Sequence, residues 1–164
     1  MVAAPFVTLD EIDTSRTVMT REEIQEILPQ RHEFAQLDAI CHLDPEEGLI
    51  AGYKDLEEEP WWAVGHIPGR PLMPGVILIE AAAQTGAILL HRLFPQVAGK
   101  FIGFGGVDRA RFRGMVEPPA RVLYMARRGR FRPRLSTMPA QAWVEGKLVF
   151  EGTILGAVMD GIGG

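Results

Sequence analysis

Cysteine is almost absent from this chain of 164 residues, because Cys41 is the only one. A single thiol cannot form an intrachain disulfide, and there is no Cys/His cluster that would suggest a zinc site. The first residues also lack the basic segment and the long apolar segment of a secretory signal peptide. These absences exclude a disulfide-stapled or zinc-stapled domain and make a reducing cytoplasm the simplest location.

Extremes of composition are missing as well. Hydrophobic residues make up 47% and charged residues 23% of the chain, which excludes wholesale disorder and fibrous repeats. The length fits one domain, and a chain of this size buries roughly 70% of the surface that its unfolded form exposes. Such a core needs neither a disulfide nor a metal for stability, so we expect a single globular domain.

The net charge of −4 hides a strong polarity along the chain. Residues 1–60 hold 15 of the 21 acidic residues, whereas residues 108–134 hold nine of the 14 arginines and only two acidic residues. This local excess of positive charge predicts either an anionic partner or solvated strand faces that pair with the acidic first third. A nucleic-acid partner is disfavoured, because few aromatic residues stand among the arginines and the total charge is negative.

The first 19 residues have mixed polarity without a period, and we interpret them as an extended N-terminal arm. A capping box, Thr20-Arg21-Glu22-Glu23, then starts a short helix that ends before Pro29. Strand-like spacing over residues 34–43 and 49–54, on either side of a turn, predicts a hairpin.

A run rich in glycine, proline and tryptophan, WWAVGHIPGRPLMPG, covers residues 61–75. Each proline fixes a φ angle, which predicts a loop of constrained backbone. The following residues, Val76 to Leu90, are apolar on almost every side, which is typical of a helix buried on all faces. A membrane span needs about 20 apolar residues, so this shorter run, which includes Glu80 and Gln84, is expected in a protein core.

After Pro95 the pattern turns to strands. They are predicted over residues 100–108, 110–116, 121–128, 134–145 and 147–159, the last two as a hairpin that closes at Glu145-Gly146. Consecutive strands without alternating helices favour an antiparallel α+β fold, with one sheet wrapped around the long helix. This domain covers residues 20–160, between the arm of residues 1–19 and a fraying tail of residues 161–164.

Two polar side chains, Glu80 and Gln84, stand one turn apart in the apolar helix. An unpaired buried carboxylate is unstable, so burial should favour the neutral acid, which can donate a proton. Gln84 lies at i+4 on the same face and can form a hydrogen bond with Glu80. Alternatively, Glu80 reaches solvent at the helix start or meets an arginine, and periodicity alone does not separate these hypotheses.

His66 lies in the constrained loop, 14 residues before Glu80. A lone loop histidine is usually structural or solvated, but a helix start with free backbone N–H groups follows it, at Gly75 and Val76 after Pro74. Such groups can polarise a carbonyl oxygen or stabilise an enolate. A base, an acid and an oxyanion site together are the groups needed to remove a proton next to a carbonyl and to expel a β-hydroxyl group.

Three stretches carry a wider pattern. Residues 65–84 are GHIPGRPLMPGVILIEAAAQ, residues 28–31 are LPQR and residues 101–113 are FIGFGGVDRARFR. They resemble the signature GHFPGxPxMPGVxxxEAxAQ, the LPHR segment and the YFxGIDKARFKR strand pair of the FabZ-type 3-hydroxyacyl-[acyl-carrier-protein] dehydratases. The resemblance covers about residues 24–159 in consistent order, so the chain is identified as a member of the FabA/FabZ family.

The resemblance implies a hot-dog fold, in which an antiparallel sheet curls around the long helix. It also implies a homodimer with two active sites at its interface, often assembled further into a homohexamer, a trimer of dimers. The family's catalytic histidine falls on His66 and its catalytic acid on Glu80, where the FabA branch has aspartate. The carbonyl-polarising amides fall on Gly75 and Val76, and Gln84 supports Glu80.

The implied activity is that of a hydro-lyase in fatty-acid synthesis or a related lipid or polyketide pathway. It would convert a 3-hydroxyacyl thioester on acyl carrier protein (ACP) to the trans-2-enoyl thioester, without a metal or cofactor and without a nucleic-acid or membrane partner. Three arginines are the candidates for docking the acidic carrier: Arg109, Arg111 and Arg113. Candidates to line an acyl tunnel, each as readily ordinary core, are Trp61, Trp62, Ile67, Leu72, Met73, Phe101 and Phe104.

The sequence departs from the family pattern at Gln30, at Ile67 and at Trp61-Trp62, which leaves the acyl chain length and the carrier open. Two alternatives remain. A hot-dog thioesterase would need a carboxylate placed to activate water, and the spacing of His66 and Glu80 fits dehydration better. A non-catalytic acyl-thioester binding module would keep the same pair without using it.

Overall fold

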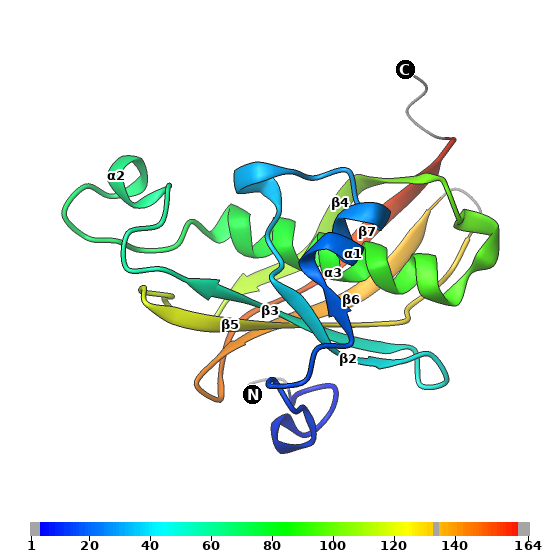
Figure 1. Ribbon diagram of the computed structural model, residues 1–164, viewed down its shortest axis with the longest axis horizontal. Helices are drawn as coiled ribbons and strands as arrows, with labels where there is room; N and C mark the ends of the chain where they lie inside the picture. Colours follow the sequence, from blue (N-terminus) through cyan, green and yellow to red (C-terminus); the bar gives the residue numbers. More distant parts are fainter. Residues whose placement is uncertain (1–3, 133–134, 161–164) are drawn as a thin grey trace.

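The computed structural model describes residues 4–132 and 135–160 (Figure 1). The predicted tail lies outside the described residues, as do the first three residues of the arm and Arg134. In chain order the helices and strands are β1 (Met19–Thr20), α1 (Arg21–Ile27), β2 (Ala39–Asp44), β3 (Leu49–Leu56), α2 (Ala63–His66), α3 (Gly75–Leu93), β4 (Phe101–Phe112), β5 (Ala120–Arg127), β6 (Ser136–Val144) and β7 (Lys147–Met159). Short 3-10 turns occur at Leu9–Glu11, His32–Phe34 and Pro95–Val97.

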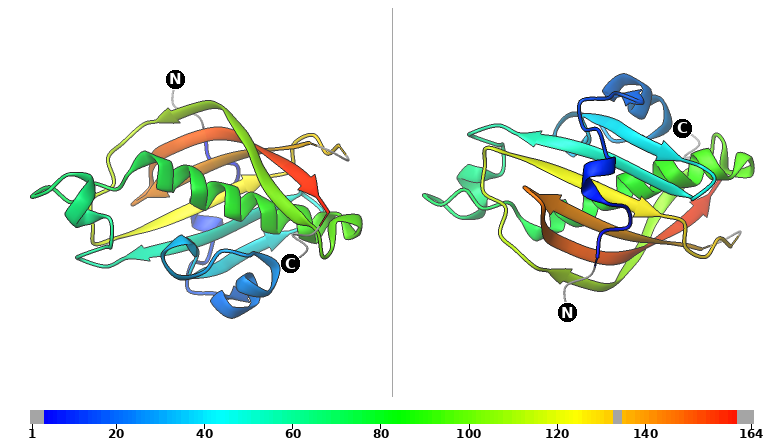
Figure 2. Two further views of the ribbon diagram at one scale, coloured as in Figure 1. Left: turned by 90° about the horizontal axis from the view of Figure 1, so that it is seen from above. Right: turned by 90° about the horizontal axis from the view of Figure 1, so that it is seen from below.

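The strands form one antiparallel sheet in the order β1-β2-β3-β5-β6-β7-β4. Figure 2 shows α3 lying in the curve of this sheet, where it packs mainly against β5, β6 and β7. The predicted α+β hot-dog fold is confirmed. β1 and β4 are the two edge strands, and β4 lies beside the start of α3, since a Cβ on Gly75 would come within 2.7 Å of the Phe112 ring.

Two short motifs, a helix cap and a tight turn, adopt the structures that the sequence predicts. The Thr20 hydroxyl accepts the N–H of Glu23, and the Glu23 carboxylate accepts the N–H of Thr20 at 2.7 Å, so the capping box that starts α1 is confirmed. The hairpin of β6 and β7 closes at Glu145 and Gly146 with φ angles of 48° and 76°. Positive φ at both positions gives the tight turn whose twist matches that of the strands.

Two details of the strand prediction are wrong. The strand expected from residue 34 begins at Ala39, because residues 32–34 form a 3-10 turn. The two strands expected over residues 100–108 and 110–116 are one strand, β4, whose register with β7 shifts between Asp108 and Arg111. Arg109 has a φ of 52° at this β-bulge. A bulge bends a strand without ending its pairing, and composition does not distinguish it from a turn.

The arm packs on the outer face of the sheet, on the side away from α3 (Figure 2). Its Phe6 and Ile12 belong to an apolar cluster that includes Cys41 and Trp143 of the sheet. Gln141 holds the arm backbone, because its Nε2 donates to the Ala4 oxygen at 2.9 Å and its Oε1 accepts the Phe6 N–H at 3.2 Å. The described part of the arm is therefore docked and includes a 3-10 turn, which differs from the extended arm predicted.

α3 is the centre of the main core. By length and composition it could cross a membrane, yet 61% of its apolar window is buried inside the protein, as in a core helix. The prediction that it is buried on every face is wrong for its first two turns. Val76 is 72% exposed, and Ile79, Glu80 and Ala83 are half-buried. No described segment of the same chain covers Val76, whereas residues 28–31 lie beside Glu80.

Candidate active site

Glu80 lies on the second turn of α3, with its carboxylate held by two amides. Its Oε1 accepts hydrogen bonds from Nε2 of Gln84 at 2.8 Å and from Nε2 of Gln30 at 3.3 Å. The i+4 bond that the sequence predicts is present. Gln30 as a second donor was not expected, because it stands 50 positions away in the sequence. Glu80 thus meets neutral amides, and among the described residues no arginine forms an ion pair with it.

The amide of Gln84 can have only one orientation. Its Oε1 accepts the backbone N–H of Gln36 at 3.0 Å, and its Nε2 donates to the backbone oxygen of Phe34 at 2.6 Å. A backbone N–H only donates and a carbonyl only accepts, so chemistry assigns the two ends of this amide. Gln84 must therefore donate to Glu80, and Oε2 of Glu80 is the oxygen left to carry a proton.

A cavity of about 360 Å³ runs along α3 beside Glu80. α1 and residues 28–31 line one side of it, and β4 and β7 line the other. On α3 it extends from Glu80 past Ala83 and Ala87 to His91, a distance of about 16 Å at 1.5 Å per residue. Its walls are mostly small or apolar, which suits an extended acyl chain.

The far end of this cavity carries a half-buried histidine. Burial, and secondly the neighbouring Arg92, hold the pKa of His91 below its ordinary value, so its imidazole is neutral at pH 7. An acyl chain that passes along α3 therefore meets a neutral ring at this end.

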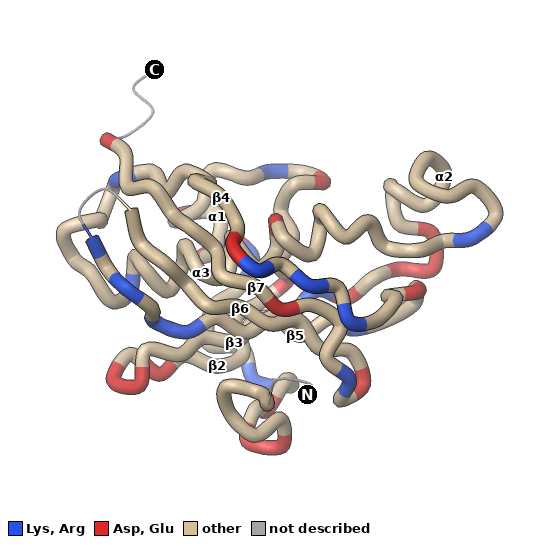
Figure 3. Tube along the Cα trace, turned by 180° about the vertical axis from the view of Figure 1, so that it is seen from behind, with Lys and Arg blue, Asp and Glu red and all other residues tan. Residues whose placement is uncertain are grey.

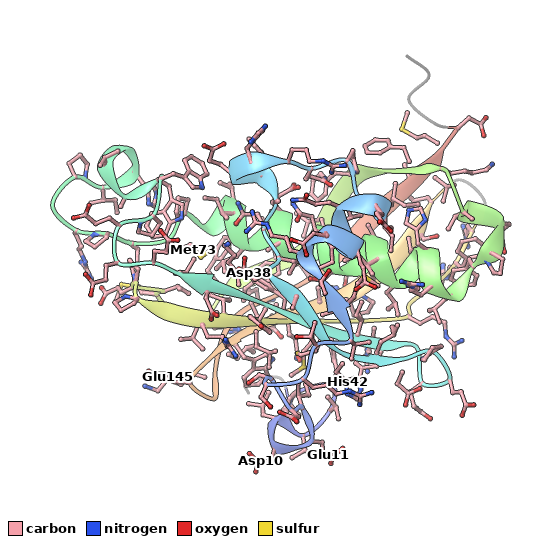
Figure 4. All side chains as sticks on the ribbon, viewed as in Figure 1. Asp10, Glu11, Asp38, His42, Met73 and Glu145 are labelled. Atoms are coloured by element: carbon pink, nitrogen blue, oxygen red, sulfur yellow. The ribbon has the colours of Figure 1, made fainter. Side chains whose placement is uncertain are left out.

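The predicted tunnel residues do not share one environment. Phe101 and Phe104 line the cavity beside Glu80. Trp62 and Met73 belong to the main core at 5% and 4% exposure, and Figure 4 labels Met73 near the start of α3. Trp61 and Ile67 are exposed at 54% and 38%, and Leu72 is half-buried. Only the two phenylalanines of the set adjoin the cavity.

His66 ends the short helix α2 in a loop that projects from the body of the molecule (Figure 1). Its Nδ1 lies 2.8 Å from the backbone oxygen of Leu72. Because a carbonyl oxygen only accepts, Nδ1 carries a hydrogen, and in the neutral tautomer Nε2 is the nitrogen with the lone pair. Residues 64–71 are all exposed, so this Nε2 is an accessible base. The cavity beside Glu80 does not include His66, and one chain alone does not bring the two residues together.

The start of α3 offers the predicted backbone donors. Pro74 precedes the helix as its N-cap, and the N–H of Ile77 donates a hydrogen bond to the backbone oxygen of Pro74 at 3.0 Å. The N–H groups of Gly75 and Val76 belong to the first turn, where the helix itself provides no carbonyl acceptor. They can therefore bind an oxygen atom of a ligand. A side chain at Gly75 would displace the Phe112 ring, because its Cβ would lie 2.7 Å from that ring.

The three predicted docking arginines differ in their surroundings. Arg113 pairs with Glu151, with 2.9 Å between Nε and Oε1, which neutralises much of its charge. Arg109 and Arg111 are exposed and line a hollow of about 510 Å³ on the outer side of the sheet, beside Arg127. Figure 3 shows basic and acidic positions interspersed over this surface. Within residues 4–132 and 135–160, no group of three or more His, Cys, Asp or Glu side chains is placed to hold a metal ion.

Residues 28–153 match the model of the FabA-like domain. The 3-hydroxyacyl-[acyl-carrier-protein] dehydratase FabZ of Herpetosiphon aurantiacus is 39% identical over 144 residues, which cover 87% of this chain and all of that protein. The protein of the same name from Chloroflexus aggregans is 36% identical over 87% of this chain and 98% of its own length.

Solved structures share the fold at much lower identity. The dehydratase heterocomplex ApeI:P from Xenorhabdus doucetiae gives a TM-score of 0.68 at 12% identity, over 84% of this chain and 91% of that one. A hypothetical thioesterase with coenzyme A from Streptococcus pneumoniae gives 0.57 at 9% identity, over 84% and 91%. These likenesses concern the fold alone. The matching domain model and the near full-length relatives show that this chain belongs to the FabA-like family.

Proposed function

We propose that this protein is a 3-hydroxyacyl-ACP dehydratase of fatty-acid synthesis, which removes water from a 3-hydroxyacyl thioester to give the trans-2-enoyl thioester. The observation that carries the proposal is Glu80, which lies beside a cavity long enough for an acyl chain. One oxygen of its carboxyl group is held by two amides, and the other has no hydrogen-bond partner among the described residues. The FabZ relatives, which match this chain over nearly their whole length, are named for this activity.

Each group has one task in the reaction. Nε2 of His66 takes a proton from C2 of the thioester. The N–H groups of Gly75 and Val76 bind the thioester oxygen as charge develops on it, and one such donor contributes about 3 kcal/mol. Oε2 of Glu80 gives its proton to the C3 hydroxyl group, which leaves as water. Return of the proton from His66 to Glu80 through solvent completes the cycle.

Two subunits form each site in this proposal. The His66 loop is exposed on its own chain, and the first turns of α3 present an uncovered face that includes Val76. β4 is an unpaired edge, and its Phe104 and Phe112 are 54% and 52% exposed. A second copy that pairs with this edge buries these side chains and can bring its own His66 to the Glu80 cavity. A trimer of such dimers and a cytoplasmic location extend the proposal on the family resemblance.

The carrier protein docks, in this proposal, on Arg109 and Arg111. These exposed guanidinium groups stand on the strand whose Phe112 touches the start of α3, so the docking surface and the oxyanion site share one strand. Arg113 contributes less, because Glu151 already neutralises it.

A turnover assay with 3-hydroxyacyl thioesters tests the function. We expect the absorbance of the enoyl thioester to rise with the unchanged protein. His66→Ala and Glu80→Gln should each lower kcat by about 10²–10⁴-fold, the usual contribution of a general base or acid. His42→Ala is the matched control, because His42 lies on β2 outside the Glu80 cavity (Figure 4), and it should retain full activity.

The same assay separates the alternatives. Release of free thiol without enoyl product would identify a thioesterase and contradict the dehydratase. Binding of the thioester without either product would identify a binding module. The thioesterase of similar fold is only 9% identical, so nothing beyond the fold favours that activity.

A further inference from the structure

We propose that Gln30 is a substrate-binding residue of this site, and that its side-chain oxygen accepts the hydrogen bond of the C3 hydroxyl group that leaves as water. The inference rests on the proposed dehydratase function and adds a residue that the sequence did not assign to the chemistry. The side-chain oxygen of Gln30 is a buried hydrogen-bond acceptor without a donor among the described residues.

Gln30 follows α1 and lines the Glu80 cavity. Its Nε2 donates to Oε1 of Glu80 at 3.3 Å, while its own Oε1 is buried and has no hydrogen-bond donor among the residues that the structure describes. Buried polar atoms nearly always have a partner, so an unpaired one requires an explanation. The Tyr124 hydroxyl is also buried and unpaired, but Tyr124 does not line this cavity.

The orientation of the Gln30 amide follows from its neighbour. Gln84 has only one allowed orientation and makes Oε1 of Glu80 an acceptor. The atom of Gln30 that faces this oxygen must therefore be the NH₂ group, because two acceptors would repel. The unpaired oxygen of Gln30 is thus the other end of the same amide, one amide group away from the acid that the reaction uses.

The leaving hydroxyl group needs both a donor and an acceptor. Oε2 of Glu80 donates a proton to the hydroxyl oxygen, the C3–O bond breaks with its electron pair on that oxygen, and water forms. The electron pair of the C2–H bond becomes the C2=C3 double bond as the proton moves to Nε2 of His66. Throughout, the original hydroxyl hydrogen needs an acceptor, and Oε1 of Gln30 supplies it. This oxygen has almost no surface open to solvent in the free chain, so it accepts the hydroxyl group only when the Gln30 side chain turns toward the cavity.

The test compares two thioesters of equal chain length, one with the 3-hydroxyl group and one saturated. Both are bound to the His66→Ala protein, which cannot consume them, and dissociation constants are measured by calorimetry. We expect this parent to prefer the hydroxylated ligand by about tenfold, the usual effect of one buried hydrogen bond. Gln30→Met in the same background should bring the ratio close to one and leave the affinity for the saturated thioester unchanged.

Gln25→Met is the matched control, because Gln25 also lines the cavity, and it should keep the preference. Thermal unfolding checks that each variant is folded, and Gln30→Leu provides a second measurement of the same ratio. The proposal would be overturned if Gln30→Met lost affinity for both thioesters equally or kept the preference for the hydroxylated one. It would also be overturned if the His66→Ala parent bound both thioesters with the same affinity. Failure of the dehydratase function is visible separately, since the unchanged protein would then form no enoyl thioester.

Discussion

Residues outside α3 determine which carboxyl oxygen of Glu80 accepts the hydrogen bonds. The backbone N–H of Gln36 and the backbone oxygen of Phe34 orient Gln84, and Gln84 in turn donates to Oε1 of Glu80. The loop after the 3-10 turn at residues 32–34 thereby determines which carboxyl oxygen can hold the proton. These hydrogen bonds should also stabilise the fold, because Gln84 and Gln36 are buried, with 2% and 5% of their surface exposed.

Removal of the Gln84 amide should affect stability and turnover together. Gln84→Met keeps the side-chain volume but leaves the buried N–H of Gln36 and the part-buried carbonyl oxygen of Phe34 without their side-chain partner. We expect the free energy of unfolding to fall by about 2–4 kcal/mol. Urea denaturation measures it, and the control Gln25→Met, in which no side-chain hydrogen bond is lost, should stay within about 0.5 kcal/mol. If Gln84→Met were as stable as the control, the orientation argument would be wrong.

At the scale of elements, α3 is both a core helix and a cavity wall. Ala81, Ala82 and Ile88 are fully buried against the sheet, while Ala83 and Ala87 line the cavity on another side of the same helix. Small side chains on successive turns of the cavity side leave room along the helix. The apolar character of α3 on almost every side thus has two causes, contact with the protein core and contact with the cavity that we propose for the acyl chain.

A large side chain at Ala87 should therefore act as a stop for the acyl chain. Ala87→Phe fills the part of the cavity between Glu80 and His91, without touching either residue of the acid–base pair. We expect kcat/KM for long-chain 3-hydroxyacyl thioesters to fall by about tenfold or more, because their chain ends lose the space. Short-chain substrates serve as the internal control. Equal losses for short and long chains would show that the acyl chain takes another path.

At the scale of the whole molecule, the two residues of the proposed acid–base pair are separated within one chain. The Glu80 cavity lies between α1, α3 and the β4 edge, and the His66 loop projects from the body of the molecule (Figure 1). The exposed phenylalanines of β4 and the uncovered first turns of α3 lie on the surface that a partner would need. The docked arm, in contrast, covers the outer face of the sheet.

The sequence predicts those features of the fold that depend on residues close together in the chain. The capping box at Thr20, the turn at Glu145-Gly146 and the long apolar helix depend on neighbouring residues, and a long motif identifies the family. The bulge at Arg109, the docking of the arm and the amides around Glu80 depend on residues far apart in the chain. Trp62 and Met73 illustrate the limit, since an apolar residue suits a core and a tunnel equally well.

Subunit complementation is the most direct test of the central claim that His66 of one chain acts with Glu80 of another. His66→Ala and Glu80→Ala proteins, each inactive alone, are mixed, unfolded and refolded together. A mixed dimer contains one site with both residues intact, so dehydration should return to about a quarter of the unchanged protein's rate. A mixture that is folded and dimeric but forms no enoyl thioester would contradict the claim.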